Sequence, residues 1–380
     1  MLIKLERRDK ALRTLPALKR VYRCQCGRSV FFQNSQCLNC GLALGYEPHA
    51  GKVVSLVPAE TEELWKITPA TGRTTRPYRR CANLSTPAGC NWIFHDPRAA
   101  GSAAHLCIAC RLNRAIPDLS IEENAARWGR IENAKRRVLS LLVALKLPLL
   151  SRVSEDGQRG LAFDFLAQVP GGLPVMTGHA DGVITLNIAE ADDATREQVR
   201  ADMREPYRTL VGHFRHELGH YYWYRLVAGS PELIEGFREV FGDEREDYAA
   251  ALQRNYSEGP MPDWQSKYVT AYASVHPWED WAETWAHYLH MIDTAGTAAS
   301  FGLNRTALGL MFDRFEATML YRADDPGAGQ FLSLLNSWVE LTALMNELSR
   351  SMGVHDLYPF ALPKAAAAKL QFIHMVVAGA

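Results

Sequence analysis

The chain has 380 residues, of which 47% are hydrophobic and 22% charged, and this composition excludes an intrinsically disordered protein. Lysine plus arginine and aspartate plus glutamate both number 42, so the whole molecule offers no general electrostatic reason to bind nucleic acid or an anionic membrane. The N-terminus lacks the apolar stretch of a secretory signal, and the run from Leu139 to Leu150 is shorter than the roughly 20 residues that span a bilayer. We therefore expect neither a membrane protein nor a secreted one, and predict a cytoplasmic location.

Charge is unevenly distributed along the chain. Residues 1–120 contain 18 Lys/Arg and 8 Asp/Glu, whereas the remaining residues contain 24 and 34. All eight cysteines also fall in the basic first third, and such a shift in composition marks a domain boundary. We predict a basic N-terminal arm at 1–20, a cysteine-rich region at 21–117 and a second domain at 118–380.

The first set of cysteines forms two knuckles, each followed by glycine. Cys24 and Cys26 precede Gly27, and ten residues later Cys37 and Cys40 precede Gly41. Four thiolates at this spacing satisfy tetrahedral zinc, and the metal stabilises a segment too small for a core of its own. The pattern predicts a zinc ribbon with one structural zinc bound by Cys24, Cys26, Cys37 and Cys40.

The second set is spaced less regularly. Cys81 and Cys90 are separated by eight residues, and only Cys107 and Cys110 form a regular knuckle. We predict a second structural zinc bound by all four. Two alternatives remain open: His95 or His105 could replace one cysteine, or the cysteines could form disulfides, which a reducing compartment disfavours. Because four thiolates leave no open coordination position, neither zinc is expected to be catalytic.

The cysteine-rich region also carries a cluster of arginines that bears on its role, at Arg73, Arg76, Arg79 and Arg80. Such a cluster could contact nucleic acid. However, no stripe of aromatic and basic residues accompanies it, which makes nucleic acid the less favoured partner. We expect the region to dock a substrate or a protein partner, or only to stabilise the fold.

After the cysteines, the pattern changes to helices and short strands. The sequence Ser120-Ile-Glu-Glu123 resembles a capping box and predicts a helix that continues to Leu145. Two strands are expected at 161–167 and 182–188, the second because polar and apolar residues alternate along it. This second strand precedes the next long helix and could pair with an extended substrate.

The rest of the second domain is predicted to be helical. After Asp192 and Asp193 the chain turns helical, and Pro206 suits the first residue of a long helix that ends near Gly229. Further helices are expected at 308–320, 330–352 and 365–377. The predicted fold class is therefore α+β, mostly α, with a small antiparallel sheet.

The predicted long helix contains His216-Glu217-Leu218-Gly219-His220, a match to H-E-x-x-H. Residues four apart lie on one helical face, so both imidazoles can bind one ion, and Glu217 can accept a proton from a water molecule beside it. This pattern indicates a catalytic zinc site with His216 and His220 as ligands and Glu217 as general base. Such a site needs a third protein ligand and an open position.

The third ligand must come from elsewhere in the chain. The extended metzincin motif is excluded because Trp223 and Leu226 stand where it requires glycine and histidine. A second helix predicted to begin at Pro277 places Glu279 and Glu283 on one face, where a metal and its histidine ligand would relieve the repulsion between the carboxylates. Three nearby residues are alternative ligands: His276, which would sit at the N-cap, His287 and His290.

These motifs resemble those of a known family. H-E-x-G-H followed by a tyrosine and an E-x-x-x-E helix is similar to the gluzincin peptidases of the anthrax lethal factor type, over residues 213–290. Nearly the whole chain resembles the bacterial "putative zinc-binding metallopeptidase" proteins, which join a zinc ribbon to such a zincin-like domain. The resemblance implies that Glu279 is the third zinc ligand, that Glu283 orients a ligating imidazole, and that Tyr272 donates a hydrogen bond to the oxyanion. Three other tyrosines compete for this last role: Tyr248, Tyr256 and Tyr268.

The predicted activity is hydrolysis of peptide bonds in a peptide or protein substrate, with one catalytic and two structural Zn2+ ions. The alternative is a zinc-dependent binding or adaptor protein, for a protein or a nucleic acid, whose peptidase-like domain is inactive. The presence of Glu217 favours the enzyme, because a purely structural metal site needs no base.

Overall fold

The protein is described by a computed structural model that covers residues 19–68, 77–95, 105–169, 171–203, 205–303 and 310–380. Strands predominate before residue 122 and helices after it, which confirms a mixed α+β protein. The basic arm lies outside the described residues except for its last two, and so do Arg73 and Arg76 of the arginine cluster.

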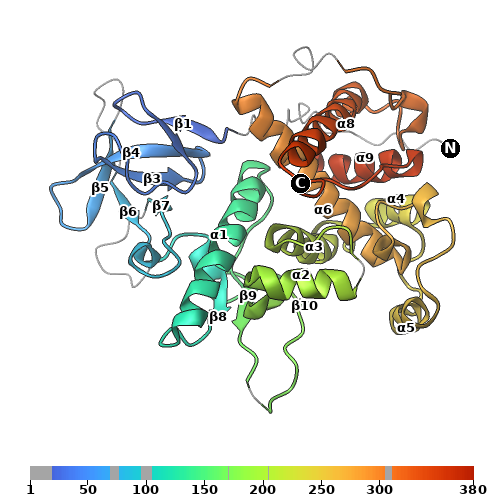
Figure 1. Ribbon diagram of the computed structural model, residues 1–380, viewed down its shortest axis with the longest axis horizontal. Coiled ribbons are helices and arrows are strands. Elements are labelled where there is room, and N and C mark those ends of the chain that lie inside the picture. The colour runs from blue at the N-terminus through green and yellow to red at the C-terminus, as the bar shows by residue number, and fades with distance from the viewer. Residues whose placement is uncertain (1–18, 69–76, 96–104, 170, 204, 304–309) are drawn as a thin grey trace.

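The cysteine-rich region is a small all-β unit (Figure 1). A hairpin of β1 (Val21–Arg23) and β2 (Ser29–Phe31) precedes a five-stranded antiparallel sheet of order β3-β4-β5-β6-β7. The sheet strands are β3 (Ala43–Glu47), β4 (Lys52–Pro58), β5 (Leu64–Ile67), β6 (Tyr78–Arg80) and β7 (Ile93–Phe94). In its core Phe32 packs edge to face on Tyr46, and Tyr46 packs on Trp92 with the rings tilted, which gives this small unit an apolar centre.

A second sheet has four strands in the order β10-β11-β9-β8. Its strands are β8 (Asn113–Ala115), β9 (Ala162–Leu166), β10 (Gly178–Ala180) and β11 (Val183–Asn187). The predicted antiparallel sheet is wrong: β8 and β11 both pair with β9 in parallel, and only β10 and β11 are antiparallel. The reason is that helix α1 (Glu122–Ala144) carries the chain from the end of β8 back to the start of β9, as a parallel pair requires.

Eight α-helices occur in the described part of the chain, and most of them lie on the side of α1 away from the cysteine-rich region (Figure 1). Besides α1 they are α2 (Asp193–Asp202), α3 (Leu210–Tyr222), α4 (Pro231–Phe241), α5 (Tyr248–Glu258), α6 (Pro277–Ser300), α8 (Ala328–Ser351) and α9 (Lys364–Gly379). The inner face of the second sheet packs on α3 through Phe163, Phe165 and Phe214. This contact holds α3 beside the sheet.

Helix α1 is confirmed with its cap one residue after the predicted Ser120, whereas the predicted start of α3 is wrong by four residues. Ser120 does not cap α1, because its hydroxyl donates to the Asp118 carboxylate at 2.7 Å and Ile121 occupies the N-cap position. Pro206 is not the first residue of α3; the helix begins at Leu210, and the Thr209 hydroxyl accepts a hydrogen bond from the Gly212 N–H at 3.0 Å. In both cases the side-chain hydrogen bonds of nearby loop residues decide where the helix begins.

The predictions for the C-terminal helices are partly confirmed. Helices α8 and α9 match the segments expected at 330–352 and 365–377 within two residues. The helix expected at 308–320 is absent from 310–320, where the regular structure is a single turn at Ala317–Met319, and 308 and 309 lie outside the described residues. No helix in the described part of the chain has both the length and the apolar character needed to cross a bilayer.

One carboxylate joins the cysteine-rich region to three helical elements. Asp293 of α6 accepts from Arg20, just before β1, at 2.6 Å, from Arg137 of α1 at 3.0 Å and from Arg215 of α3 at 2.8 Å. Although burial opposes ionisation, the three guanidinium groups lower the pKa of Asp293 to about 2. The hydrophobic core is likewise continuous from Trp92 through α1 to α3 and α6.

Candidate metal centres and active site

The first cysteine set converges at the knuckles of the cysteine-rich region. The Sγ atoms of Cys24 and Cys40 are 3.6 Å apart and those of Cys26 and Cys37 are 3.7 Å apart. Thiolates about 2.3 Å from a tetrahedral zinc are about 3.8 Å from one another, whereas a disulfide requires about 2.05 Å. All eight cysteines of the chain are free, so the disulfide alternative is wrong.

The second set converges as well, despite its irregular spacing. The Sγ atoms of Cys90 and Cys107 are 3.7 Å apart, and Cys81 and Cys110 complete a buried group of four. Burial raises the pKa of the Cys90 and Cys107 thiols, so a cation is needed for all four to be thiolates together. Neither histidine alternative is part of the group: the His95 Nδ1 is 3.1 Å from the carbonyl oxygen of Pro77, and the backbone carbonyl of His105 accepts from Ala82.

Arg79 and Arg80, the two arginines of the cluster that the structure describes, make their contacts within the cysteine-rich region. Arg79 pairs with Glu63 at 2.8 Å, and the Arg80 guanidinium lies over the Trp65 ring and donates to the carbonyl oxygen of Ser35. These contacts hold β6 against its neighbours.

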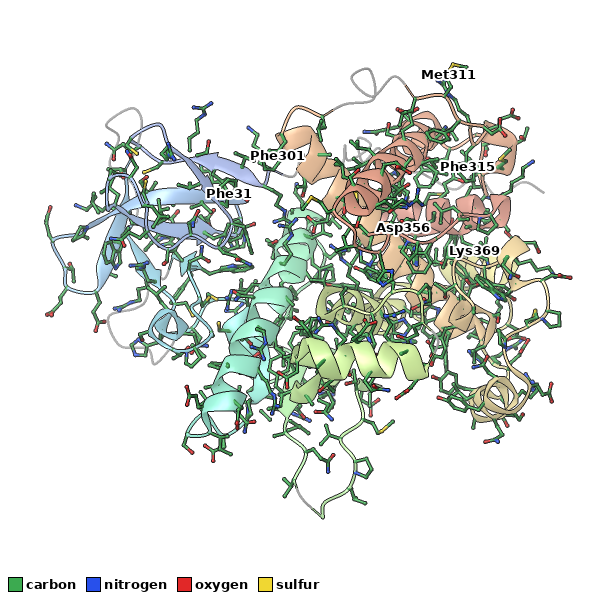
Figure 2. The ribbon with its side chains drawn as sticks, in the orientation of Figure 1. Phe31, Phe301, Met311, Phe315, Asp356 and Lys369 are labelled. Carbon is green, nitrogen blue, oxygen red and sulfur yellow. The ribbon has the colours of Figure 1, made fainter. Side chains whose placement is uncertain are left out.

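The candidate active site depends on the close approach of α3 and α6. A Cβ atom on Gly219 of α3 would lie 2.9 Å from the Cα of Ala282 of α6, so only glycine permits this spacing. The Trp281 indole N–H donates to the Gly219 carbonyl oxygen at 2.9 Å and fixes the rotation of one helix against the other. On the other side of α6, Lys369 of α9 (Figure 2) donates to Asp280 at 2.6 Å.

This packing brings three metal-ligating side chains together. The His216 Nε2 lies 3.3 Å from the His220 Nε2 and 3.1 Å from the Glu279 Oε2, and the His220 Nε2 lies 3.6 Å from the same carboxylate oxygen. Nitrogen and oxygen ligands of a tetrahedral zinc are about 3.3–3.4 Å apart. The Glu279 carboxylate is buried, and its Oε2 makes no hydrogen bond of good geometry among the described residues, although the two imidazole nitrogens approach it. The residues therefore fit a zinc ion, which would satisfy this oxygen.

Neighbouring residues orient two of the three side chains. The His216 Nδ1 is 2.7 Å from Glu283, whose second oxygen accepts from the Thr270 hydroxyl at 2.7 Å. The Tyr248 hydroxyl, at the first residue of α5, donates to the Glu279 Oε1 at 2.6 Å. Thr270 could not be predicted from the sequence, because it lies in a loop and its distance along the chain from the other site residues matches no known motif.

The electrostatics of the site also favour a cation. Burial alone would lower the pKa of His216, but the carboxylates of Glu279 and Glu283 outweigh burial and raise it well above its ordinary value. Without a metal ion, the two carboxylates therefore favour the protonated form of this imidazole. The position between the two histidines and Glu279 is thus one that holds positive charge.

The candidate base and the tyrosines surround this position. Glu217 is half-buried. Burial, followed by the charge of Glu279, raises the pKa of Tyr248, and the charge of Glu217 adds a smaller contribution. The Tyr272 ring centroid is 6.1 Å from that of His216, and burial followed by the charge of Glu279 raises the pKa of the Tyr272 phenol. Two of the competing tyrosines are used elsewhere on the protein. Tyr256 is 67% exposed, and the ring of Tyr268 packs under the Lys369 ammonium group.

The three histidines considered as alternative ligands make hydrogen bonds to other groups. His276 caps α6 by accepting from the Trp278 N–H at 3.1 Å, as its position at the N-cap predicts. His287 is 2.5 Å from the Tyr358 hydroxyl, and His290 is 2.5 Å from the Arg215 guanidinium. None of the three belongs to the cluster of ligand atoms.

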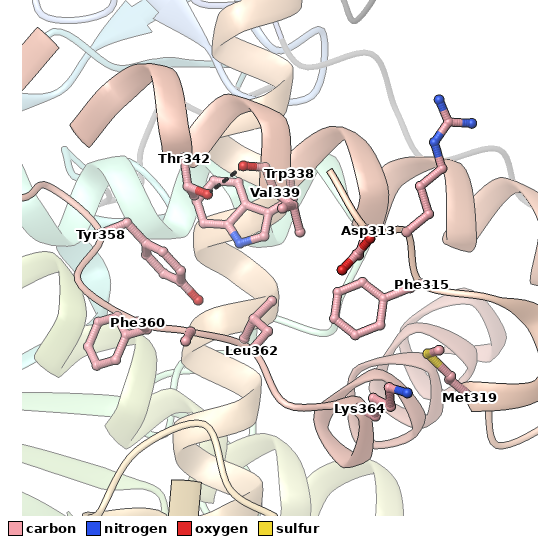
Figure 3. A pocket seen from close by; sticks show the side chains of 12 residues that line it. Asp313, Phe315, Met319, Trp338, Val339, Thr342, Tyr358, Phe360, Leu362 and Lys364 are labelled. Atoms are coloured by element: carbon pink, nitrogen blue, oxygen red, sulfur yellow. Dashed lines mark hydrogen bonds between the residues drawn. The ribbon is translucent and has the colours of Figure 1, made fainter. Parts of the chain in front are cut away.

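The second sheet has one free edge beside α3. The expected substrate strand, β11, is flanked by β9 and β10 and has no free edge, so that expectation is wrong. Strand β10 is one of the two edge strands, the other being β8, and a hollow of about 510 Å³ lies along β10, lined also by Arg114, Arg152 and Thr185. A separate pocket of about 350 Å³ lies between α8 and the segment before α9, lined by aromatic side chains such as Trp338 and Phe360 (Figure 3).

Comparisons with known proteins agree with these clusters. Residues 124–376 match the family described as "putative zinc-binding metallo-peptidase", and residues 21–121 match a zinc-ribbon domain. The uncharacterized proteins Rv2568c of Mycobacterium tuberculosis and Mb2598c of Mycobacterium bovis are each 43% identical over 352 residues, which is 93% of this chain and 93% of theirs. No solved structure matches the chain. Zinc binding is supported by both family descriptions and by the cysteine clusters.

Proposed function

The chain belongs to the "putative zinc-binding metallo-peptidase" family, and from this premise we propose that it is a zinc-dependent peptidase of the gluzincin type. The observation that carries the proposal is the convergence of His216, His220 and Glu279 beside Glu217. We infer that the first three hold the catalytic zinc and that the domain is zincin-like, similar to the lethal factor peptidases.

Zinc held by these residues would act as a Lewis acid toward the scissile carbonyl and would lower the pKa of a bound water toward about 7. Glu217 accepts the proton of the attacking water and passes it to the leaving amine. Glu283 keeps the His216 ring in place through its Nδ1, which leaves Nε2 to face the metal.

The two tyrosines near the site have different roles in this proposal. Tyr248 donates to Glu279, so its hydroxyl is used in holding the carboxylate. Tyr272 lies beside His216, and because its pKa is raised the phenol stays protonated and can donate to the oxyanion. Strand β10 offers its free edge to an extended peptide or protein substrate.

The proposed metal content is three zinc ions per chain, one catalytic and two structural. The two cysteine sets satisfy tetrahedral coordination without an open position, so their ions only stabilise the fold. The cysteine-rich region, through its exposed hairpin, remains our candidate for docking a substrate or a protein partner.

The decisive experiment compares Glu217→Gln with the wild-type protein. Metal content is measured by mass spectrometry, and hydrolysis is followed with a library of internally quenched fluorescent peptides. We expect the variant to keep three zinc ions and to lose hydrolysis by about 10²-fold or more, because only the base is removed. Glu258→Gln, at the exposed end of α5, makes the same chemical change away from the site and serves as the control.

Two results would refute the proposal. One is a wild-type protein that holds three zinc ions and cleaves no peptide in the library. The other is a Glu217→Gln variant as active as the control. The first result, together with binding of RNA or DNA that weakens steeply with salt, would establish the binding-protein alternative.

A further inference from the structure

A tight hairpin beside the candidate active site fixes the ring of one further histidine. Strands β10 and β11 pair Ala180 with Val183, so only Asp181 and Gly182 form the turn. Their φ angles are 48° and 78°, and two successive positive φ values define the type I′ turn that Asp-Gly favours. Glycine is required at the second position, because a Cβ there would lie 2.5 Å from the Gly160 carbonyl oxygen.

The turn determines which nitrogen of His179 carries the proton. The backbone N–H of Gly182 donates to the His179 Nε2 at 3.1 Å. An imidazole nitrogen that accepts a hydrogen bond is unprotonated, so in the neutral ring the proton resides on Nδ1. A ring with both nitrogens protonated could not accept this bond, so the contact with Gly182 also requires the neutral form of the imidazole.

His179 lies on the edge strand on the side of α3. Its ring centroid is 6.3 Å from that of His220, with 17° between the planes, and 6.1 Å from that of Tyr224. The side chain is half-buried, and no group in the described part of the chain hydrogen-bonds its Nδ1. A neutral imidazole with a fixed tautomer and an available N–H thus stands next to a candidate zinc ligand, on the strand whose edge is free.

We propose that His179 donates a hydrogen bond from its Nδ1–H to the carbonyl oxygen of the scissile peptide bond. This inference rests on the proposed function and adds a second donor, on the β10 side of the site, to Tyr272. A neutral donor held by a backbone N–H needs no reorientation when charge develops on that oxygen. His179 is then a catalytic residue, and its loss should lower kcat more than it raises KM.

The competing explanation is that His179 only caps the hairpin, and two substitutions separate the two roles. In His179→Asn the amide nitrogen can occupy the place of Nδ1 and donate, but the bond from Gly182 is lost. In His179→Gln the amide oxygen can occupy the place of Nε2 and accept from Gly182, but the donor at Nδ1 is lost. His179→Ala removes both functions.

The variants are compared by kcat, KM and melting temperature on the fluorescent peptide library. We expect His179→Ala and His179→Gln to lose about 10²-fold in kcat, as for the loss of one oxyanion donor, while His179→Asn retains most of it. His179→Gln should keep the wild-type melting temperature. If His179→Gln is fully active and His179→Asn is not, the histidine only caps the hairpin and the inference is overturned.

A measurement without turnover completes the test. In metal-depleted protein labelled with 15N-histidine, NMR should show His179 neutral with its proton on Nδ1 at pH 7; a proton on Nε2 would overturn the inference. Failure of this inference is distinguishable from failure of the proposed function. A wild-type chain that cleaves no peptide refutes both, whereas an active wild type with an equally active His179→Ala refutes the inference alone.

Discussion

Gly219→Ala tests whether the spacing of α3 and α6 determines the candidate metal site. The added Cβ would lie 2.9 Å from the Ala282 Cα and 3.3 Å from its carbonyl oxygen, against an ordinary contact of about 3.5–4.0 Å. Both of these atoms belong to the backbone of α6 and cannot rotate away from the new Cβ. To restore an ordinary contact, the two helices must separate by about 0.5–1 Å. Overpacking of this kind costs about 1–3 kcal/mol, which the better helix propensity of alanine offsets by about 1 kcal/mol.

The larger effect is expected at the site. Separation of the helices moves Glu279 away from the two histidines, and a displacement near 1 Å costs about 10²-fold in catalysis. We therefore expect Gly219→Ala to unfold within a few degrees of the wild type but to lose its catalytic zinc to a chelator sooner and to fall about 10²-fold in kcat/KM. Zinc release with a colorimetric chelator and peptide hydrolysis measure these effects.

The control for this substitution is Gly329→Ala in α8. Gly329 is exposed, and no atom lies within 4 Å of the position of its Cβ, so alanine should only stabilise the helix. If Gly219→Ala holds zinc and cleaves peptides as the control does, the packing at Gly219 does not set the geometry of the ligands, and the reasoning is wrong.

Three further predictions concern metal and proton binding. Glu283→Gln leaves the His216 ring less firmly held, so zinc affinity by competition titration should fall about 10–100-fold; an unchanged affinity contradicts the role of Glu283. Cys107→Ser, in the buried set, should lower the midpoint of denaturant unfolding more than Cys26→Ser at the exposed knuckle, and equal shifts would contradict the burial argument. In metal-free protein the pKa of His216 is raised, so its contribution to stability is present below its ordinary value of 6.5 and is lost as the pH rises toward the raised pKa. The melting temperature after chelation should therefore fall from pH 6.5 upward, and zinc should suppress this fall.

The candidate ligands His216 and His220 could be predicted from the sequence because their spacing is local, whereas Glu279 was implied by the family resemblance. His216 and His220 share a helical face wherever the helix lies, and Glu279 follows a proline that suits a helix start. Their meeting depends on Gly219, whose role is apparent only when α6 is packed against it. The first cysteine set could be predicted for the same reason, since pairs of thiolates close in the chain need little tertiary information, whereas in the second set only Cys107 and Cys110 are so close.

The parallel pairing of the strands in the second sheet could not be predicted from the sequence. Strand β8 has three residues and is Asn113-Arg-Ala115, with neither alternation nor β-branched side chains, so nothing marks it before it pairs with β9. Thr270 and Tyr248 reach the site from a loop and from the start of a helix, at distances in sequence that no motif specifies. His179 could not be assigned to the site from the sequence, because only one strand was expected here, at 182–188, and the short strand β10 before the Asp-Gly turn has no alternation to mark it.

The single carboxylate of Asp293 makes the two regions of this protein inseparable. A fragment beginning at residue 118 would lack β8, which would expose the hydrogen-bonding edge of the buried strand β9, and it would also lack Arg20. The second cysteine set is similarly tied to α1, since the Cys110 sulfur approaches the buried carboxylate of Glu132 at 4.0 Å. A fragment made for expression should therefore keep the cysteine-rich third, because a disturbance of its cysteine sets would be transmitted through α1 to α3, the helix that carries His216 and His220.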